Sequence, residues 1–178
     1  MVVVALLLAA CGGDDSSSVP LATTTSSVLA SVPHEFDTSP VTSAAVGRGL
    51  LADVRVGVHD EGFVRVTFEF DALPGYRVAF TERPITQDGS GDEVALAGSA
   101  ALLVRMEPAS SFDLEASKAT YTGPKRIATS SEAAPEVVFV GDFEAVLAWA
   151  IGLDKERPFR AFTLASPARL VVDIATED

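Results

Sequence analysis

The chain has 178 residues, a formal net charge of −12 at pH 7, 48% hydrophobic residues and 21% charged residues. A balance this acidic argues against a nucleic-acid-binding protein, because affinity for phosphate backbones depends on clustered cations. The hydrophobic fraction is typical of a chain that buries a core, and a single cysteine rules out an internal disulfide framework. No apolar run reaches the roughly 18 residues of a membrane-spanning helix, and the length suits one domain or two small ones.

The N-terminus carries an apolar block over residues 1–10, MVVVALLLAA, which is followed by Cys11 and by GGDDSSS. An apolar stretch of this length that ends in small residues is typical of a signal peptide and is too short for a mature membrane span. The segment Leu8-Ala9-Ala10-Cys11 resembles a bacterial lipobox, in which a signal peptidase cleaves before the cysteine and the thiol carries diacylglycerol. We therefore predict a lipoprotein signal peptide over residues 1–10 and lipidation of Cys11.

Residues 12–47 are rich in Ser, Thr, Ala, Val and Pro and contain four acidic residues but neither lysine nor arginine. A segment of this composition buries too little apolar surface to offset the entropy that it loses on ordering. We therefore predict that residues 11–47 form a flexible, disordered tether. It would hold a folded domain, residues 48–178, at the extracytoplasmic face of the cell membrane.

The first strand pair is predicted on either side of Asp60-Glu61-Gly62, where two runs alternate apolar and polar residues. This period of two is typical of half-buried strands, and the segment between the runs suits a three-residue hairpin loop with Gly62 in the left-handed conformation. Such a loop sets the register of the two strands. In this register their apolar residues share one face, which we expect to be buried. The predicted partners are Val58 with Val64, Val56 with Val66 and Val54 with Phe68.

Further short strands are predicted along the rest of the chain. They cover residues 76–80, 102–106, 137–140, 145–153, 159–164 and 169–174. Gly141-Asp142 is predicted as the turn of a second hairpin, and the polar residues 110–134 as a long loop with one short helical turn. Seven or more short strands at this spacing, without a helix of three turns, predict an all-β fold, a β-sandwich of short antiparallel strands.

Three segments carry a resemblance to a known family. They are residues 53–57 (DVRVG), residues 63–70 (FVRVTFEF) and residues 159–173 (FRAFTLASPARLVVD). These segments resemble the AMIN or AMIN-like domain. Together with the central residues 138–154, the resemblance covers residues 52–175.

The resemblance implies a β-sandwich of the kind found at the N-terminus of N-acetylmuramoyl-L-alanine amidases and in pilus secretins, with a role in envelope localisation and peptidoglycan binding. Such a domain has no catalytic centre of its own. No zinc hydrolase domain follows in the given sequence, so amidase activity is not implied. The overall arrangement resembles actinobacterial lipoproteins with a single domain of this type.

The resemblance therefore implies peptidoglycan or another cell-wall glycan as the partner. The alternative is a protein-interaction module that recruits an envelope enzyme or a secretion component. Such a module would make contact through an edge strand, or through the strand around Trp149, which is apolar on both faces.

Candidate catalytic residues are scarce. A hydrolase needs a general base near its nucleophile, or clustered metal ligands, and the sequence has only His34 and His59. It has no G-x-S-x-G elbow and no H-E-x-x-H motif. His59 suits a solvated turn, and the three carboxylates of residues 88–93 suit an acidic loop as well as a Ca²⁺ site that departs from the EF-hand spacing. We predict that the chain is not an enzyme and has no cofactor or metal site.

Arginine accounts for ten of the thirteen cations, and four arginines fall on the polar side of predicted strands. Their planar guanidinium groups suit bidentate binding of carboxylates or sugar hydroxyls of a glycan. The alternative is cross-strand pairing with Asp53, Glu69 and Glu107 on a solvated face. The four candidate ligand-binding arginines are Arg55, Arg65, Arg77 and Arg105.

Aromatic side chains offer a second mode of glycan recognition. Trp149 lies in a run that is apolar on both sides, so we predict that it packs in the core. Tyr121, in the polar segment 121–126, is predicted to be exposed and is the preferred residue for stacking on a sugar. Lys125 and Arg126 follow it and complete the candidate ligand-binding set.

Overall fold

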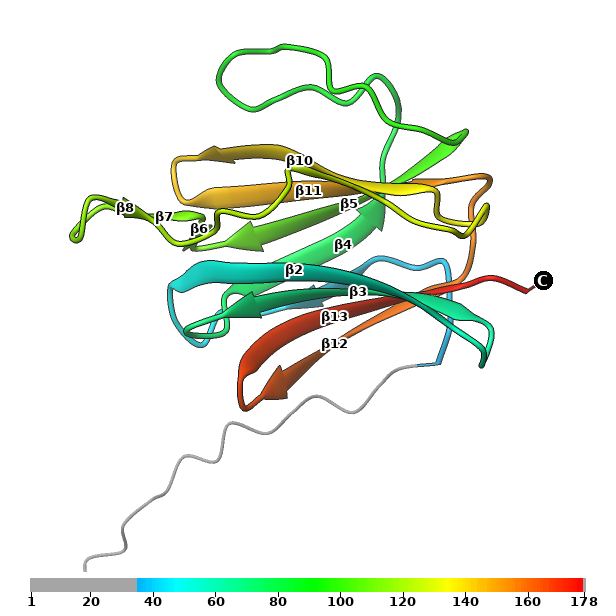
Figure 1. Cartoon of the computed structure of the whole chain (residues 1–178), viewed down its shortest axis with the longest axis horizontal. Coiled ribbons are helices and arrows are strands. Elements are labelled where there is room, and N and C mark those ends of the chain that lie inside the picture. The colour runs from blue at the N-terminus through cyan, green and yellow to red at the C-terminus, as the bar shows by residue number, and fades with distance from the viewer. Residues whose placement is uncertain (1–34, 178) are drawn as a thin grey trace, which may run out of the picture.

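Strands with one apolar face bury that face against a second layer, and this chain does so by stacking two β-sheets (Figure 1). A computed structural model describes residues 35–177, and the elements within them are strands without a helix. The all-β sandwich that the alternating pattern predicts is confirmed. Nothing in the described part of the chain is a helix long and apolar enough to cross a membrane.

The larger layer of the described residues is an antiparallel six-stranded sheet with the order β1-β4-β5-β11-β10-β9. Its strands are β1 (Val41–Ser43), β4 (Gly75–Phe80), β5 (Ala100–Glu107), β9 (Arg126–Ala128), β10 (Glu136–Phe143) and β11 (Val146–Leu153).

The smaller layer is a five-stranded sheet with the order β12-β13-β3-β2-β6, in which the pair β2 and β6 is parallel. Its strands are β2 (Gly49–His59), β3 (Phe63–Phe70), β6 (Ala109–Ser110), β12 (Phe159–Ala165) and β13 (Ala168–Ala175). A small hairpin of β7 (Phe112–Asp113) and β8 (Lys118–Ala119) projects from one end of the sandwich (Figure 1).

The core lies between the sheets and centres on Trp149 of β11, which is fully buried. Three aromatic rings meet it edge-on, with centroid distances of 6.0 Å to Phe68, 5.7 Å to Tyr121 and 5.6 Å to Phe139. Phe68 comes from the opposite sheet, so this contact joins the two layers. The predicted core position of Trp149 is confirmed.

Residues 81–99 form a long loop over the outer face of the six-stranded sheet (Figure 1). Ile85 of this loop packs with Ala148 and Ala150 of β11 in a second, smaller apolar cluster. The strand around Trp149 is therefore covered on both faces. The idea that this strand serves as a protein contact is wrong, because its second apolar face is already filled by the loop.

The first hairpin has the predicted register, with the three valine and phenylalanine pairs directly opposite each other in β2 and β3. Gly62 has a φ of +84°, the left-handed conformation that closes the loop. Its strands are buried on one side as predicted, except that Val58 is half exposed because it lies close to the turn.

The second hairpin joins β10 to β11, but its turn lies at Glu144-Ala145 rather than at Gly141-Asp142. Both turn residues have positive φ, 50° and 62°, which is the geometry of a two-residue hairpin turn without glycine. Gly141 lies instead at a register shift within β10. The predicted turn is wrong by three residues, since the glycine marks an irregularity within the strand.

The polar segment 110–134 contains short strands and no helical turn, so that part of the prediction is wrong. The carboxylate of Asp142 organises its beginning by accepting hydrogen bonds from the Ser110 hydroxyl, at 3.0 Å, and from the Ser111 amide and hydroxyl, at 2.6 and 2.7 Å. These contacts hold the segment extended against the β10–β11 hairpin.

The folded domain begins earlier than residue 48. The backbones of Asp37 and Phe159 exchange two hydrogen bonds, and Val41 pairs with Val78 where β1 extends the six-stranded sheet. The predicted tether is therefore wrong for residues 37–47, because this segment crosses from one edge strand to another and Val41 packs on the core. The predicted signal peptide, Cys11 and the rest of the predicted tether lie outside the described residues.

Candidate functional site

Three charged residues form one row across the outer face of the five-stranded sheet. Arg160 on β12 lies directly opposite Asp173 on β13, which lies directly opposite Arg65 on β3. Arg65 donates from Nε and Nη2 to the two carboxylate oxygens at 2.6 and 2.8 Å, and Arg160 donates from Nε at 2.8 Å. Asp173 is fully buried. Two guanidinium groups therefore converge on one carboxylate, which satisfies a buried charge that would otherwise be costly.

Phenylalanine rings surround the two guanidinium groups. The Arg160 guanidinium carbon lies 4.5 Å from the ring centroid of Phe36, and that of Arg65 lies 5.0 Å from the ring centroid of Phe63. The Phe162 ring lies within 6 Å of both. Stacking of this kind orients a planar cation without using its N–H groups. We call this set the Arg–Phe cluster, and its members are Phe36, Phe63, Arg65, Arg160, Phe162 and Asp173.

The Arg–Phe cluster is a positively charged site on an acidic protein, because two guanidinium groups share one carboxylate. The hydrogen bond between Arg65 and Asp173 raises the pKa of Arg65 above its usual value, so this side chain stays charged. Within residues 35–177, Nη1 of Arg65 and both Nη atoms of Arg160 donate to no protein acceptor. The two side chains remain 32% and 24% exposed. These donors suit an oxygen-rich ligand at the surface.

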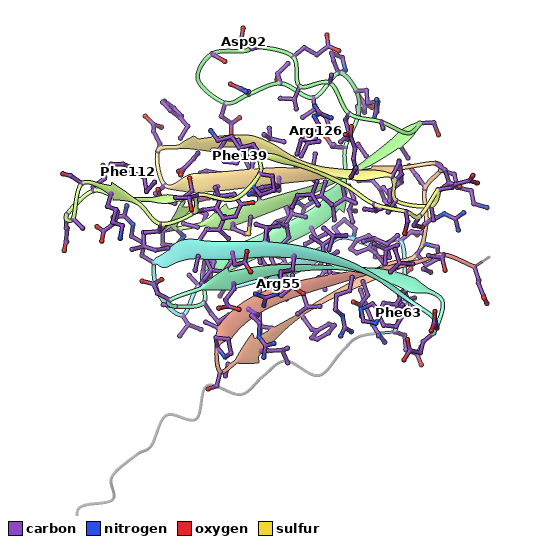
Figure 2. All side chains as sticks on the ribbon, in the orientation of Figure 1. Arg55, Phe63, Asp92, Phe112, Arg126 and Phe139 are labelled. Carbon is purple, nitrogen blue, oxygen red and sulfur yellow. The ribbon has the colours of Figure 1, made fainter. Side chains whose placement is uncertain are left out.

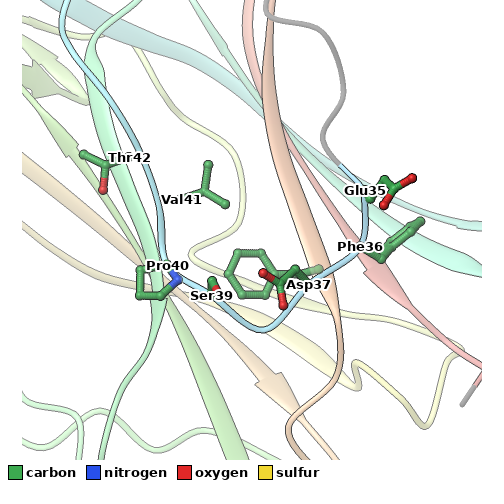
Figure 3. Close-up of a pocket in the computed structure, with 8 residues that line it drawn as sticks. Glu35, Phe36, Asp37, Ser39, Pro40, Val41 and Thr42 are labelled. Carbon is green, nitrogen blue, oxygen red and sulfur yellow. The ribbon is translucent and has the colours of Figure 1, made fainter.

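The segment that carries Phe36 also shapes a depression beside the cluster. Residues 35–42 cross the edge of the sandwich, and all of them except Thr38 line, together with Phe159, an open hollow of about 550 Å³ (Figure 3). Asp37 lies in this hollow, and a hydrogen bond from the Ser39 side chain lowers its pKa. The surface next to the Arg–Phe cluster is thus concave and carries both aromatic and acidic groups.

Arg55 lies on the same face as the Arg–Phe cluster but is engaged by acidic neighbours. It donates to Asp53 at 2.6 Å and to Glu69 at 2.7 Å, and the hydrogen bond to Glu69 is the main reason why the Arg55 pKa is raised. The cross-strand alternative is therefore what the structure shows for this arginine. Figure 2 places Arg55 and Phe63 on the five-stranded sheet, away from Arg126 on the other side.

Arg77 and Arg105 lie on β4 and β5, in the six-stranded sheet, directly opposite each other. The four predicted arginines are thus divided between the two outer faces of the sandwich and do not form one surface. Arg105 pairs with Asp88 at 3.0 Å rather than with Glu107. No group of three or more potential metal ligands occurs in the described residues, those of the 88–93 loop included.

The prediction that Tyr121 is exposed is wrong. Its side chain is 8% exposed, its hydroxyl donates to the Pro124 carbonyl at 2.7 Å, and burial raises its pKa. Its ring meets Trp149 edge-to-face in the core, and this burial leaves it unavailable for stacking on a sugar. Lys125 lies over the ring of Phe139 at 4.5 Å, and Arg126 pairs with Glu136 and binds the Ala95 carbonyl. These contacts attach β9 to β10 and to the 81–99 loop.

Most of the Arg–Phe cluster is absent from the residues that the sequence singled out. Arg65 is the one member in the predicted set. Arg160 and Phe162 are two positions apart, which places them on the same face of a strand, and this spacing was the available signal. Phe36 gave no signal, because the composition of its surroundings indicates a tether.

The fold defines a class: a β-sandwich of two stacked sheets, whose described part has no group of three or more potential metal ligands. The model of the AMIN-like domain matches residues 49–176, and the chain belongs to this family. Domains of this family are associated with the cell envelope and are generally non-catalytic localisation modules. No curated protein and no solved structure matches the chain.

Proposed function

We propose that this AMIN-like domain is a non-catalytic module that binds peptidoglycan or another cell-wall glycan through its Arg–Phe cluster. One observation carries the proposal: the guanidinium groups of Arg65 and Arg160 lie against aromatic rings, and Nη1 of Arg65 and both Nη atoms of Arg160 lack a protein acceptor in the described residues. Carboxylates and hydroxyls of a wall polymer supply the oxygens that such a fork accepts. The segments that carry the family resemblance also supply five of the six cluster residues.

Binding of this kind is short-range. The chain carries a net charge of −12 and gains no long-range attraction to an anionic polymer. At physiological salt the repulsion is screened beyond about 8 Å, so the local positive charge of the Arg–Phe cluster decides the contact.

We further propose that Cys11 carries the lipid that anchors the protein at the extracytoplasmic face of the cell membrane. The proposal is supported by the lipobox-like segment that ends at Cys11. Mass spectrometry of the N-terminal peptide from cells tests it. A diacylglyceryl adduct on Cys11, lost in Cys11→Ala, is the expected result, and an unmodified cysteine contradicts it.

Co-sedimentation of the full chain with purified sacculi tests the glycan proposal. We expect retention to fall at least fivefold in Arg160→Lys, because lysine keeps the charge beside Asp173 but lacks the planar fork. Phe36→Ala is expected to give a similar loss without touching the ion pair. The matched control is Arg169→Lys on the same sheet, since Arg169 donates only to the carbonyls of Pro167 and Ser166 within the described residues. No retention of the wild-type chain, or equal loss in the control, contradicts the proposal.

A protein-interaction role is the second candidate, and one observation favours it. Phe112 and Leu114 of the projecting segment are exposed, and so is Phe143 at the β10–β11 turn. The backbone bond from Ala109 to Ala145 and the serine contacts of Asp142 hold these two segments side by side. Cross-linking in cells to a single envelope protein, abolished by Leu114→Ser, would support this role, whereas wall retention without a cross-linked partner would exclude it.

A further inference from the structure

The outer face of the six-stranded sheet carries two like charges in direct opposition. Arg77 on β4 and Arg105 on β5 are cross-strand partners whose side chains leave the sheet on the side away from the core. Like charges at directly opposite positions destabilise a sheet. An acidic partner between them would remove the cost, as Asp173 does between Arg65 and Arg160 on the other face.

The protein supplies little of that compensation. Arg105 donates through Nη1 to Asp88 at 3.0 Å, and both side chains of this pair are well exposed. Within residues 35–177, the side chain of Arg77 forms no hydrogen bond and no ion pair. The whole fork of Arg77, together with Nε and Nη2 of Arg105, is therefore open to a ligand.

The surroundings leave room for a ligand beside both guanidinium groups. Thr42, the neighbour of Arg77 in the same cross-strand row, has a short and exposed side chain. An open hollow of about 440 Å³ lies on one side of the arginine pair, and a smaller one of about 190 Å³ on the other. The larger hollow includes the hydroxyl-bearing residues Thr42 and Ser43.

We propose that Arg77 and Arg105 form an anion site for a phosphate group. A carboxylate has two oxygens and pairs in bidentate fashion with one guanidinium fork, as Asp173 does with Arg65, while Arg160 adds a single bond. A phosphate group with three or four unesterified oxygens has enough acceptors to pair in this way with two forks that approach from neighbouring strands. Asp88 then competes with the phosphate for Arg105. The site lies on the face opposite the Arg–Phe cluster and does not depend on it. Its ligand is either a free phosphate ion or a phosphate monoester, which keeps three unesterified oxygens.

Titration of the full chain with inorganic phosphate, methyl phosphate and acetate at constant ionic strength tests the site, with arginine side-chain NMR signals as the readout. We expect saturable shifts with phosphate and at least tenfold weaker binding of acetate. Arg77→Gln should weaken phosphate binding at least tenfold, and Asp88→Asn should strengthen it at least twofold. Methyl phosphate binding as tightly as inorganic phosphate assigns a phosphate monoester, and weaker binding assigns the free ion.

Arg48→Gln is the matched control, because Arg48 is also exposed and its side chain forms no hydrogen bond or ion pair within residues 35–177. Its phosphate titration should equal that of the wild-type chain. Wild-type phosphate binding in Arg77→Gln, an equal loss in Arg48→Gln, or acetate binding as tight as phosphate binding would overturn the proposal. Circular dichroism of each variant verifies that the fold is intact, which is expected for substitutions of exposed side chains.

Discussion

The two outer faces of the sandwich carry arginines at equivalent kinds of position, but in opposite electrostatic settings. On the five-stranded sheet, Arg65 and Arg160 flank the buried carboxylate of Asp173 and are stacked by phenylalanine rings. On the six-stranded sheet, Arg77 and Arg105 face each other with no carboxylate between them. The first arrangement is held in place by the protein itself, and the second invites an anion from outside.

This difference teaches that placement on the polar side of a strand does not decide what an arginine does. The deciding factor is the residue that the neighbouring strand places beside it. A buried carboxylate makes an arginine part of the fold, and a second arginine leaves it open. The following changes separate these two cases.

The largest expected effect comes from removing the shared carboxylate. Asp173→Asn should lower the free energy of unfolding by about 2–3 kcal/mol, because two guanidinium groups then lie together without a counterion. Asp88→Asn, the matched change on the other face, should cost less than about 0.5 kcal/mol, since that ion pair is exposed. Urea unfolding at pH 7 measures both, and equal effects would contradict the distinction between the faces.

Exchanging one arginine on each face should give effects of different size and sign. Arg65→Gln is expected to cost about 2 kcal/mol, because Asp173 is left with a single partner. Arg77→Gln should be neutral or stabilise by a few tenths of a kcal/mol, since it removes the repulsion with Arg105. Thermal unfolding in phosphate-free buffer distinguishes these outcomes; a marked loss of stability in Arg77→Gln would show a partner for that residue.

Acid should weaken the contacts of the Glu136 carboxylate with Arg126 and the Ala97 amide in the six-stranded sheet. Burial raises the pKa of Glu136, but hydrogen bonds from Arg126 and the Ala97 amide outweigh this and lower it below the usual 4.5. The contact therefore stabilises the fold above pH 4.5 and is lost as the pH falls through the lowered value. Glu136→Gln should cost about 1 kcal/mol at pH 7 and nearly nothing near pH 3. Urea unfolding at the two pH values checks this, and a pH-independent difference would contradict it.

The smallest expected effect comes from giving Arg77 a carboxylate neighbour, as Arg65 has on the five-stranded sheet. Thr42 lies directly opposite Arg77, so Thr42→Asp places a carboxylate beside the unpaired guanidinium group. We expect a stabilisation of about 0.5 kcal/mol, the range of an exposed cross-strand ion pair, together with weaker phosphate binding. Unfolding and phosphate titration of the same sample measure the two effects, and unchanged phosphate binding would argue against the proposed position of the anion.

The fold was predictable where local patterns determine it. The period-two runs and Gly62 give the register of the first hairpin, and the structure confirms each predicted pair. The second turn was not predictable in the same way, because Glu144-Ala145 adopts positive φ without glycine. Residues 37–47 join the domain through backbone pairing with distant strands, and their composition does not reveal this.

The candidate site was less predictable than the fold, because its contacts are far apart in the sequence. Arg65 and Asp173 are 108 positions apart, so their ion pair depends on the pairing of β3 with β13. Tyr121 lies in a polar segment, yet it is buried because its ring completes the packing around Trp149. Strand periodicity identifies which side chains share a face, whereas strand order, set by the whole fold, identifies which of them meet.

The central claim is that the Arg–Phe cluster binds the wall polymer and that the opposite face does not contribute to this contact. Retention of the full chain on sacculi that acid treatment has freed of phosphate polymers, compared between Arg160→Lys and Arg77→Lys, tests it most directly. We predict at least a fivefold loss of retention in Arg160→Lys and wild-type retention in Arg77→Lys. Equal retention of both variants, or a loss confined to Arg77→Lys, would contradict the claim.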